Sequence, residues 1–404
     1  MRQILTLLFL VFVFFGCTPK QVVELKLPGK QPVKEKVVPK NQDTTTIVEE
    51  FTPIDIKESD NVIKESTPRS DNSNTTGQSI DPVVTTEPVI NNQNIQIDVK
   101  GAKIQIAFIY PSKLVEKYAK GSLNTISGYL SYQNADYNLV VIDSENESSE
   151  NIRTAFSKVN ESGITNVIAM FTPNAIGTLN QVVPNNLKVY LPLIEKKDSI
   201  GSNDNLIFGS ISYDEQLKKL SYYSTGKNAM FYQDTYLGMK LKRTYDSLIS
   251  DNSVQKLIKK DETNFKGIVD DYRLNNSSLF LNTDIVKTSL ILSQLTSFEI
   301  NPKLIFGTQV AYDPMIMVLT QEKDRERLVI ANSIDDVNSK LKDEIATFGG
   351  NITYEWVDYS TLVGINYLYN GGNSSLISTQ IVDNQVVYTP RLFKSTEIGF
   401  LEIK

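Results

Sequence analysis

Most of this chain alternates between two spacings of apolar side chains. Short segments at 103–110, 138–143 and 166–171 are largely apolar and rich in β-branched residues, which is typical of strands buried on both faces. The segments between them place apolar side chains three or four residues apart, as at Val115 and Ala119, which is the spacing of a helix. This alternation predicts parallel sheets with helices on both faces.

A second run of the same kind begins near Tyr213. Further strand-like segments lie at 228–233, 277–282, 302–308 and 327–332, with helical spacing between them. Roughly 300 residues are more than one hydrophobic core usually holds. We therefore predict an α/β fold of two doubly wound parallel-sheet lobes with a cleft between them. Lobe 1 is expected to hold about 101–211 and part of 312–404, and lobe 2 about 212–311 and the remainder.

Local signals mark several helix ends and one hairpin. Ser112 is placed to cap the first helix, and Thr172 precedes Pro173, which is favoured at the first position of a helix. Gly371 is expected to end the last helix of the chain. The polar pair at 383–384 stands between two strand-like segments and predicts a hairpin turn.

Residues 18–100 differ in composition from everything that follows. Eight prolines punctuate them, Phe51 is their one aromatic residue, and Thr, Ser, Asn, Lys and Glu fill much of the rest. Such a stretch buries too little apolar surface to offset the cost of ordering the chain. We predict a disordered tether, with a short piece at 94–99 that could add a strand at the edge of the domain.

The N-terminal segment contains the only cysteine. An apolar run at 4–15 is too short to span a bilayer, and Gly16 and Cys17 follow it. The arrangement at 1–17 resembles a bacterial lipoprotein signal, which implies lipidation of Cys17 and anchoring in the cell envelope. Thr18 in place of Asp favours the outer membrane. An uncleaved anchor, or an ordinary signal with an incidental cysteine, remains open.

Charge and residue types exclude several functions. The formal net charge is −6, so there is no electrostatic footprint for nucleic-acid binding. The chain has no histidine, and its one cysteine lies near the N-terminus, which excludes Ser-His-Asp and Cys-His nucleophiles and the usual zinc sites. No phosphate-binding glycine loop occurs. We predict a non-catalytic protein without metal or cofactor, while a carboxylate or Ser-Lys enzyme stays open.

Three segments in order resemble the type I periplasmic binding protein family. The segment 106–111 looks like the family's first strand and its turn, and 206–220 looks like the passage to the second lobe, with Tyr213 and Gln216 in their usual setting. The segment 231–241 looks like the second-lobe strand that is followed by an acidic residue, an aromatic residue and a glycine. The resemblance covers about residues 101 to 404.

Within that fold the end of the chain resembles the C-terminal domain of LpoA, the penicillin-binding protein activator. The segments 363–372 and 379–394 look like that family's last helix and closing hairpin, with Arg391 in a basic-then-aromatic ending. The resemblance implies a regulator that binds a cell-wall synthase or another envelope protein. The fold alone implies the alternative, a receptor for an amino acid or another small molecule that serves an ABC importer.

Ligands of open α/β sheets bind beyond the carboxyl ends of the strands. Amino-acid binders of the resembled fold hold the ligand carboxylate with small hydroxyl residues after the third strand, where this chain has Thr172. The other reading is that Thr172 only caps a helix and that the tyrosines pack at a rim. The candidate cleft residues are Tyr110, Thr172, Asn174, Tyr213, Tyr236, Asn282, Thr283 and Tyr312.

Overall fold

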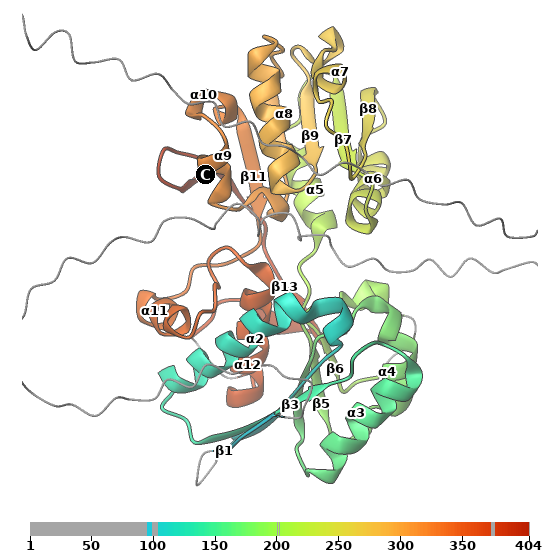
Figure 1. Ribbon diagram of the computed structural model, residues 1–404, viewed down its shortest axis with the longest axis vertical. Coiled ribbons are helices and arrows are strands. Elements are labelled where there is room, and N and C mark those ends of the chain that lie inside the picture. The colour runs from blue at the N-terminus through green and yellow to red at the C-terminus, as the bar shows by residue number, and fades with distance from the viewer. Residues whose placement is uncertain (1–94, 99–103, 200, 202, 373–375, 404) are drawn as a thin grey trace, which may run out of the picture. The chain divides into compact units, whose positions relative to one another are not determined.

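The structure is a computed structural model that describes residues 95–98, 104–199, 201, 203–372 and 376–403 (Figure 1). The predicted signal segment and all of the predicted tether except its last strand-like piece lie outside the described residues. The chain forms two sheets flanked by helices, one sheet in each of two lobes. The predicted α/β fold of two doubly wound lobes is therefore confirmed.

The sheet of lobe 1 has eight strands in the order β1-β3-β2-β4-β5-β6-β13-β12. The strands β2 to β6 are mutually parallel, and β1 pairs antiparallel with β3 at the edge, as the sequence predicts for 94–99. The bounds are β1 (Ile95–Asp98), β2 (Ile104–Tyr110), β3 (Tyr137–Asp143), β4 (Asn166–Ala169), β5 (Lys188–Leu191), β6 (Leu206–Phe208), β12 (Gln380–Val382) and β13 (Gln385–Val387).

The sheet of lobe 2 has seven strands in the order β15-β14-β11-β10-β9-β7-β8. Its five parallel strands have the order β8-β7-β9-β10-β11, which corresponds to β3-β2-β4-β5-β6 in lobe 1. The apolar pattern does not predict the antiparallel pair β14 and β15. The bounds are β7 (Asn228–Gln233), β8 (Asn252–Ile258), β9 (Ser278–Asn282), β10 (Leu304–Gly307), β11 (Leu328–Asn332), β14 (Arg391–Ser395) and β15 (Phe400–Ile403).

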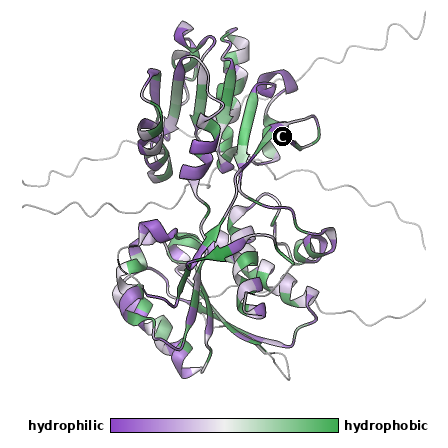
Figure 2. Cartoon of the chain, turned by 180° about the vertical axis from the view of Figure 1, so that it is seen from behind, coloured by the Kyte–Doolittle hydropathy of each residue, from purple (hydrophilic) through white to green (hydrophobic). Residues whose placement is uncertain are grey.

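Helices cover both faces of each sheet and bury its apolar side chains. The strands are mainly hydrophobic, while the outer helix faces are hydrophilic (Figure 2). In lobe 1 one face carries α2 (Ser112–Tyr132), α11 (Ser339–Thr347) and α12 (Trp356–Asn370), and the other carries α3 (Ser149–Glu161) and α4 (Ile176–Val182). In lobe 2 one face carries α5 (Tyr213–Ser221) and α6 (Tyr236–Leu248), and the other carries α7 (Lys266–Val269), α8 (Ile285–Ser297) and α9 (Met315–Leu319).

Short elements complete the lobes. The helix α10 (Glu322–Arg325) packs against α8. The described part of the chain also has the 3-10 turns η2 (Pro173–Ala175), η3 (Lys196–Asp198), η4 (Tyr272–Leu274) and η5 (Gln309–Ala311).

The helix-end predictions have mixed outcomes. Ser112 does not cap α2, because the backbone N–H of Ser112 itself donates to Oδ1 of Asp143, at 3.1 Å, at the end of the neighbouring strand β3. Gly371 ends α12 in the left-handed conformation at φ 62°, which confirms that prediction. The 383–384 hairpin is also confirmed, since it joins β12 to β13 and both turn residues have positive φ.

The chain passes between the lobes three times, at 209–212, 333–338 and 388–390. These crossing segments and their flanks are hydrogen-bonded to one another. The hydroxyl of Tyr388 donates to the carbonyl of Gly209 at 2.6 Å, and the Arg391 guanidinium donates to the carbonyl of Ile334 at 2.8 Å. The bonds fix the crossings side by side and so position the strand ends of the two lobes around a cleft.

Candidate functional site: the interlobe cleft

Two cavities lie at the carboxyl ends of the parallel strands, where side chains of both lobes meet. Cavity 1 has a volume of about 90 Å³ and cavity 2 of about 190 Å³. Tyr118 of α2, Tyr213 of α5, Leu237 of α6 and Trp356 of α12 line both of them. The cavities are thus neighbouring compartments of one cleft, at the sheet edge where ligands of doubly wound folds bind.

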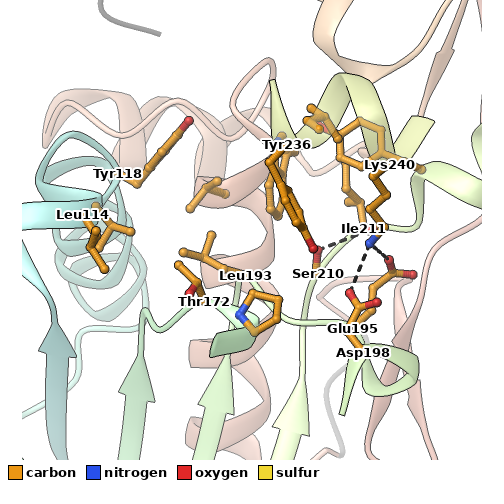
Figure 3. A pocket seen from close by; sticks show the side chains of 16 residues that line it. Leu114, Tyr118, Thr172, Leu193, Glu195, Asp198, Ser210, Ile211, Tyr236 and Lys240 are labelled. Atoms are coloured by element: carbon orange, nitrogen blue, oxygen red, sulfur yellow. Dashed lines mark hydrogen bonds and ion pairs between the residues drawn. The ribbon is translucent and has the colours of Figure 1, made fainter. Parts of the chain in front are cut away.

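Cavity 1 is mostly apolar (Figure 3). Its charged side chains are Glu195 and Asp198, which follow β5, and Lys240, which comes from α6. Thr172, which follows β4, is one of its few other polar groups. The aliphatic side chains of the wall belong to Leu114, Val115, Leu193, Ile211, Leu237 and Val357.

Thr172 already has an anionic partner within the chain. Its backbone N–H donates to Oε1 of Glu147 at 2.5 Å, and its hydroxyl donates to Oε2 of the same carboxylate at 2.6 Å. Glu147 lies in the loop between β3 and α3, where burial raises the pKa of its carboxyl although the Thr172 hydrogen bonds lower it. Thr172 stands at the N-cap position of η2 and Pro173 at its first position, as the sequence predicts, but the Thr172 side chain makes no capping hydrogen bond.

A cluster of charged side chains joins the two lobes beside cavity 1. Lys240 Nζ of lobe 2 lies 3.3 Å from Glu195 Oε2 and 3.1 Å from Asp198 Oδ2 of lobe 1. Lys197 of lobe 1 pairs with Glu195 Oε1 at 3.0 Å and also with Asp214 of α5. Burial alone would lower the pKa of Lys240, but the carboxylates of Glu195 and Asp198 raise it above its ordinary value. Lys240 therefore stays protonated and ties the lobes together.

Cavity 2 lies at the switch point of lobe 2. The strands β7 and β9 are neighbours there, and their connections leave the sheet in opposite directions. Asp284, Asp313 and Glu355 line the cavity, and no lysine or arginine is among the described residues that do so. Five aromatic side chains complete the wall, namely Tyr118, Tyr213, Tyr312, Tyr354 and Trp356.

The structure brings most of the predicted cleft residues together. Tyr110 is an exception, because its ring is buried in the core of lobe 1 with its centroid 5.8 Å from that of Phe108. Asn174 is exposed and lines neither cavity. The residues that do line cavity 1 or cavity 2 are Thr172, Tyr213, Tyr236, Asn282, Thr283 and Tyr312.

Sequence reasoning did not find several cleft residues. Trp356 is the only tryptophan of the chain, a signal that could have drawn attention to it. Tyr118 lies beside the apolar stripe of α2, and Glu355 directly precedes α12. Glu147 stands in a polar loop without any motif, so its contact with Thr172 becomes visible only in the folded chain.

Among the described residues, no group of three or more acidic, cysteine or histidine side chains is arranged so that it could hold a metal ion. No helix in that part of the chain is long and apolar enough to cross a membrane.

Comparison with solved structures places the fold. A protein of Rhodospirillum rubrum described as a branched-chain amino acid ABC transporter aligns with a TM-score of 0.59 at 11% identity, over 74% of this chain and 99% of the other. A branched-chain amino acid ABC transporter protein of Thermus thermophilus with bound valine aligns with a TM-score of 0.56 at 12% identity, over 75% and 96%. The described chain has the type I periplasmic binding protein fold.

A structure of LpoA is also similar to the fold of this chain. Full-length LpoA of Haemophilus influenzae aligns with a TM-score of 0.53 at 9% identity, over 76% of this chain but only 60% of LpoA. No family model matches the sequence, and no curated protein matches it. At these identities the likeness establishes the fold and leaves the choice between receptor and LpoA-like protein to the cleft itself.

Proposed function

We propose that this chain is a non-catalytic lipoprotein of the cell envelope that binds a protein partner and regulates a cell-wall synthase, as its resemblance to LpoA implies. The observation that carries the proposal is the pair of hydrogen bonds from Thr172 to Glu147. By resemblance, Thr172 stands where amino-acid binders of this fold hold the ligand carboxylate. In this chain a carboxylate of the protein itself has that place.

An internal carboxylate competes strongly with a free ligand. Glu147 follows β3 and Thr172 follows β4, the two strands that flank β2 in the same sheet, so Glu147 meets Thr172 at a high effective concentration and without loss of translational freedom. A free amino acid would have to displace Glu147 from Thr172, and the displaced carboxylate would lose both hydrogen bonds and need hydration instead. The arrangement therefore favours a partner-binding role over amino-acid capture.

The remaining parts of the proposal rest on the sequence. Cys17 would carry the lipid, and residues 18–100 would give the lobes reach from the membrane, which we place as the outer membrane. The chain has no histidine, which removes the usual general base of an enzyme. These features suit a regulator that faces the periplasm and acts through contact.

A binding and activity experiment tests the proposal. The full-length chain is titrated onto an immobilised bifunctional penicillin-binding protein, and glycan polymerisation and cross-linking rates are measured with and without it. We expect saturable binding and a change in at least one rate, with a type I amino-acid receptor as the inactive control protein. If the chain neither bound the penicillin-binding protein nor changed either rate, the proposal would be refuted.

A receptor for an ABC importer is the second candidate. It is favoured by the two cavities at the strand ends and by the similarity to the valine-bound structure. A screen of thermal stability across amino acids, peptides and sugars distinguishes it, because a ligand at 100 times its dissociation constant adds ~2.7 kcal/mol of stability. Stabilisation by a free amino acid would favour this candidate over the regulator.

A further inference from the structure

The two lobes differ at one equivalent edge of their sheets (Figure 1). In lobe 1 the outer side of β3 is covered by β1, which pairs with it antiparallel. In lobe 2 the corresponding strand β8 is the last strand of its sheet, and no described residue pairs with its outer side. The edge of β8 is therefore open where the same edge of lobe 1 is covered.

This open edge is also long. The strand β8 has seven residues, whereas the other strands at sheet edges in the described chain, β1, β12 and β15, have four, three and four. An edge strand presents a row of unpaired backbone N–H and C=O groups, to which another strand can add. Short edge strands are one way in which proteins avoid such pairing, and β8 lacks this protection.

The ladder to β7 shows which backbone groups of β8 face outward. The carbonyl of Ile258 accepts from the N–H of the residue after β7 at 2.9 Å, so Ile258 faces β7. Because successive residues of a strand alternate between its two sides, the backbone groups of Gln255 and Leu257 face the open edge. The carbonyl of Ser253 is also turned away from β7, and the exposed Arg273 guanidinium donates to it over 3.4 Å.

A second copy of β8 fits this edge in an antiparallel register. Full overlap of two copies of Asn252–Ile258 places a two-fold axis at Gln255, the central residue. Two residues that face each other across an antiparallel pair exchange both of their backbone hydrogen bonds or neither of them. The outward-facing N–H and C=O of Gln255 allow the exchange of both. Such a contact uses the same surface on each copy and closes with two subunits.

The charges at the two ends of β8 complement each other in this register. Asp251 directly precedes the strand and Lys259 directly follows it, so antiparallel overlap sets Asp251 of each copy beside Lys259 of the other. Both side chains are exposed, and neither forms an ion pair among the described residues. Leu257, which is 42% exposed, would be covered by the added strand. The edge is thus self-complementary in backbone groups and in charge.

We propose that the outer edge of β8 is a self-association surface, at which two copies of this chain join their lobe 2 sheets into one continuous sheet. The two Gln255 residues face each other at the axis, Ser253 pairs with Leu257 on either side of it, and Asp251 pairs with Lys259 at each end. None of the residues that line the two cavities belongs to β8, so the inference is independent of the cleft and of the proposed function.

Sedimentation velocity of the full-length chain at several concentrations measures the association. We expect a monomer–dimer equilibrium for the unsubstituted chain. Asp251→Lys and Lys259→Glu should each raise the dissociation constant roughly 10-fold, because like charges then meet at both ends of the strand pair. Lys303→Glu makes the same charge change at an exposed lysine before the interior strand β10, and it should leave the association unchanged.

Mixing the two charge variants tests the antiparallel pairing. In a mixed dimer of Asp251→Lys and Lys259→Glu chains, opposite charges meet at both ends of the strand pair. An equimolar mixture should therefore associate more tightly than either variant alone. A chain that carries both substitutions should regain the association of the unsubstituted chain, because each end then again joins a lysine to a carboxylate.

A cross-linking experiment tests the position of the axis. Gln255→Cys on a Cys17→Ser background, which removes the only native thiol, should form a disulfide-linked dimer on mild oxidation. Facing Cα atoms in a hydrogen-bonded pair lie about 5.5 Å apart, which is within the range of a disulfide. Leu257→Cys on the same background is the matched control and should not cross-link, because each Leu257 faces Ser253 of the other copy.

Several results would overturn the inference. These are a chain that stays monomeric at its highest soluble concentration, association that neither charge variant weakens, or equal cross-linking at positions 255 and 257. Protection of the Leu257 N–H from hydrogen exchange in a monomer would mean that another segment of the same chain covers the edge, and the inference would again be wrong. Circular dichroism shows whether each variant is folded.

Discussion

The carboxyl group of Asp358 accepts a hydrogen bond from the backbone N–H of Asn351 at 2.8 Å while it is almost fully buried. Asp358 lies on α12, and its carboxyl faces Gly121 of α2, where a Cβ atom would come within 2.5 Å of Oδ1. Burial raises the pKa of Asp358 to about 7, and the charge of Glu355 adds to the rise although the Asn351 hydrogen bond opposes it. The packing of α12 on α2 is therefore sensitive to pH.

The first prediction follows from the sign of this shift. A carboxyl whose pKa is higher in the folded state contributes stability that is fully present below its unfolded pKa and is lost as the pH rises through the folded value. Unfolding free energies should therefore fall by roughly 1.4 kcal/mol per pH unit between about pH 4 and 7 from this group alone. Asp358→Asn should remove this contribution, as measured by urea unfolding at several pH values. Parallel pH curves for the two proteins would contradict it.

A second prediction concerns the contact between α12 and the sheet of lobe 1. Tyr190 of β5 is fully buried, and a Cβ atom at Gly364 would lie 2.3 Å from its ring. Gly364→Ala should lower the unfolding free energy by about 1–3 kcal/mol through overpacking. Gly177→Ala in α4 is the matched control, since nothing lies within 4 Å of its added methyl group. Equal unfolding midpoints for the two variants would refute the packing argument.

A third prediction concerns the ion cluster between the lobes. Lys240→Met leaves Asp198 without this cation and Glu195 with Lys197 alone, so stability should fall by about 1–3 kcal/mol. Lys242→Met lies on the same helix but breaks an i,i+4 pair with Asp246 and a contact of the ammonium with the Tyr232 ring at 5.9 Å, which should together cost about 1 kcal/mol. Thermal unfolding at low and high salt measures both. A larger effect at Lys242 would show that the cluster does not tie the lobes.

A fourth prediction addresses the membrane anchor. Cys17→Ser removes the thiol that lipidation requires, so the variant should leave the membrane fraction and lose labelling by a fatty-acid analogue. Fractionation with immunoblotting measures the first outcome, and in-gel detection measures the second. A variant that stays fully membrane-bound would mean that the apolar run at 4–15 is an uncleaved anchor.

The sequence predicted the strands and the two-lobed fold better than it predicted the side-chain contacts of the cleft. Buried parallel strands such as β2 and β9 are continuous apolar runs, so their positions and the sheet edge that carries the site could be read directly. The short strands β14 and β15 were missed because such edge pairs have weak patterns. The contacts from Thr172 to Glu147 and from Lys240 to Glu195 join residues 25 and 45 positions apart, and only loop geometry decides them.

We infer that Glu147 occupies the two hydrogen-bond donors of Thr172 that a ligand carboxylate would need. Titration of valine into the full-length chain and into the Glu147→Ala variant, followed by calorimetry, tests it most directly. We expect no binding to the unsubstituted chain, and binding only where the substitution frees the backbone N–H and hydroxyl of Thr172. Micromolar valine binding to the unsubstituted chain, weakened by Glu147→Ala, would contradict it.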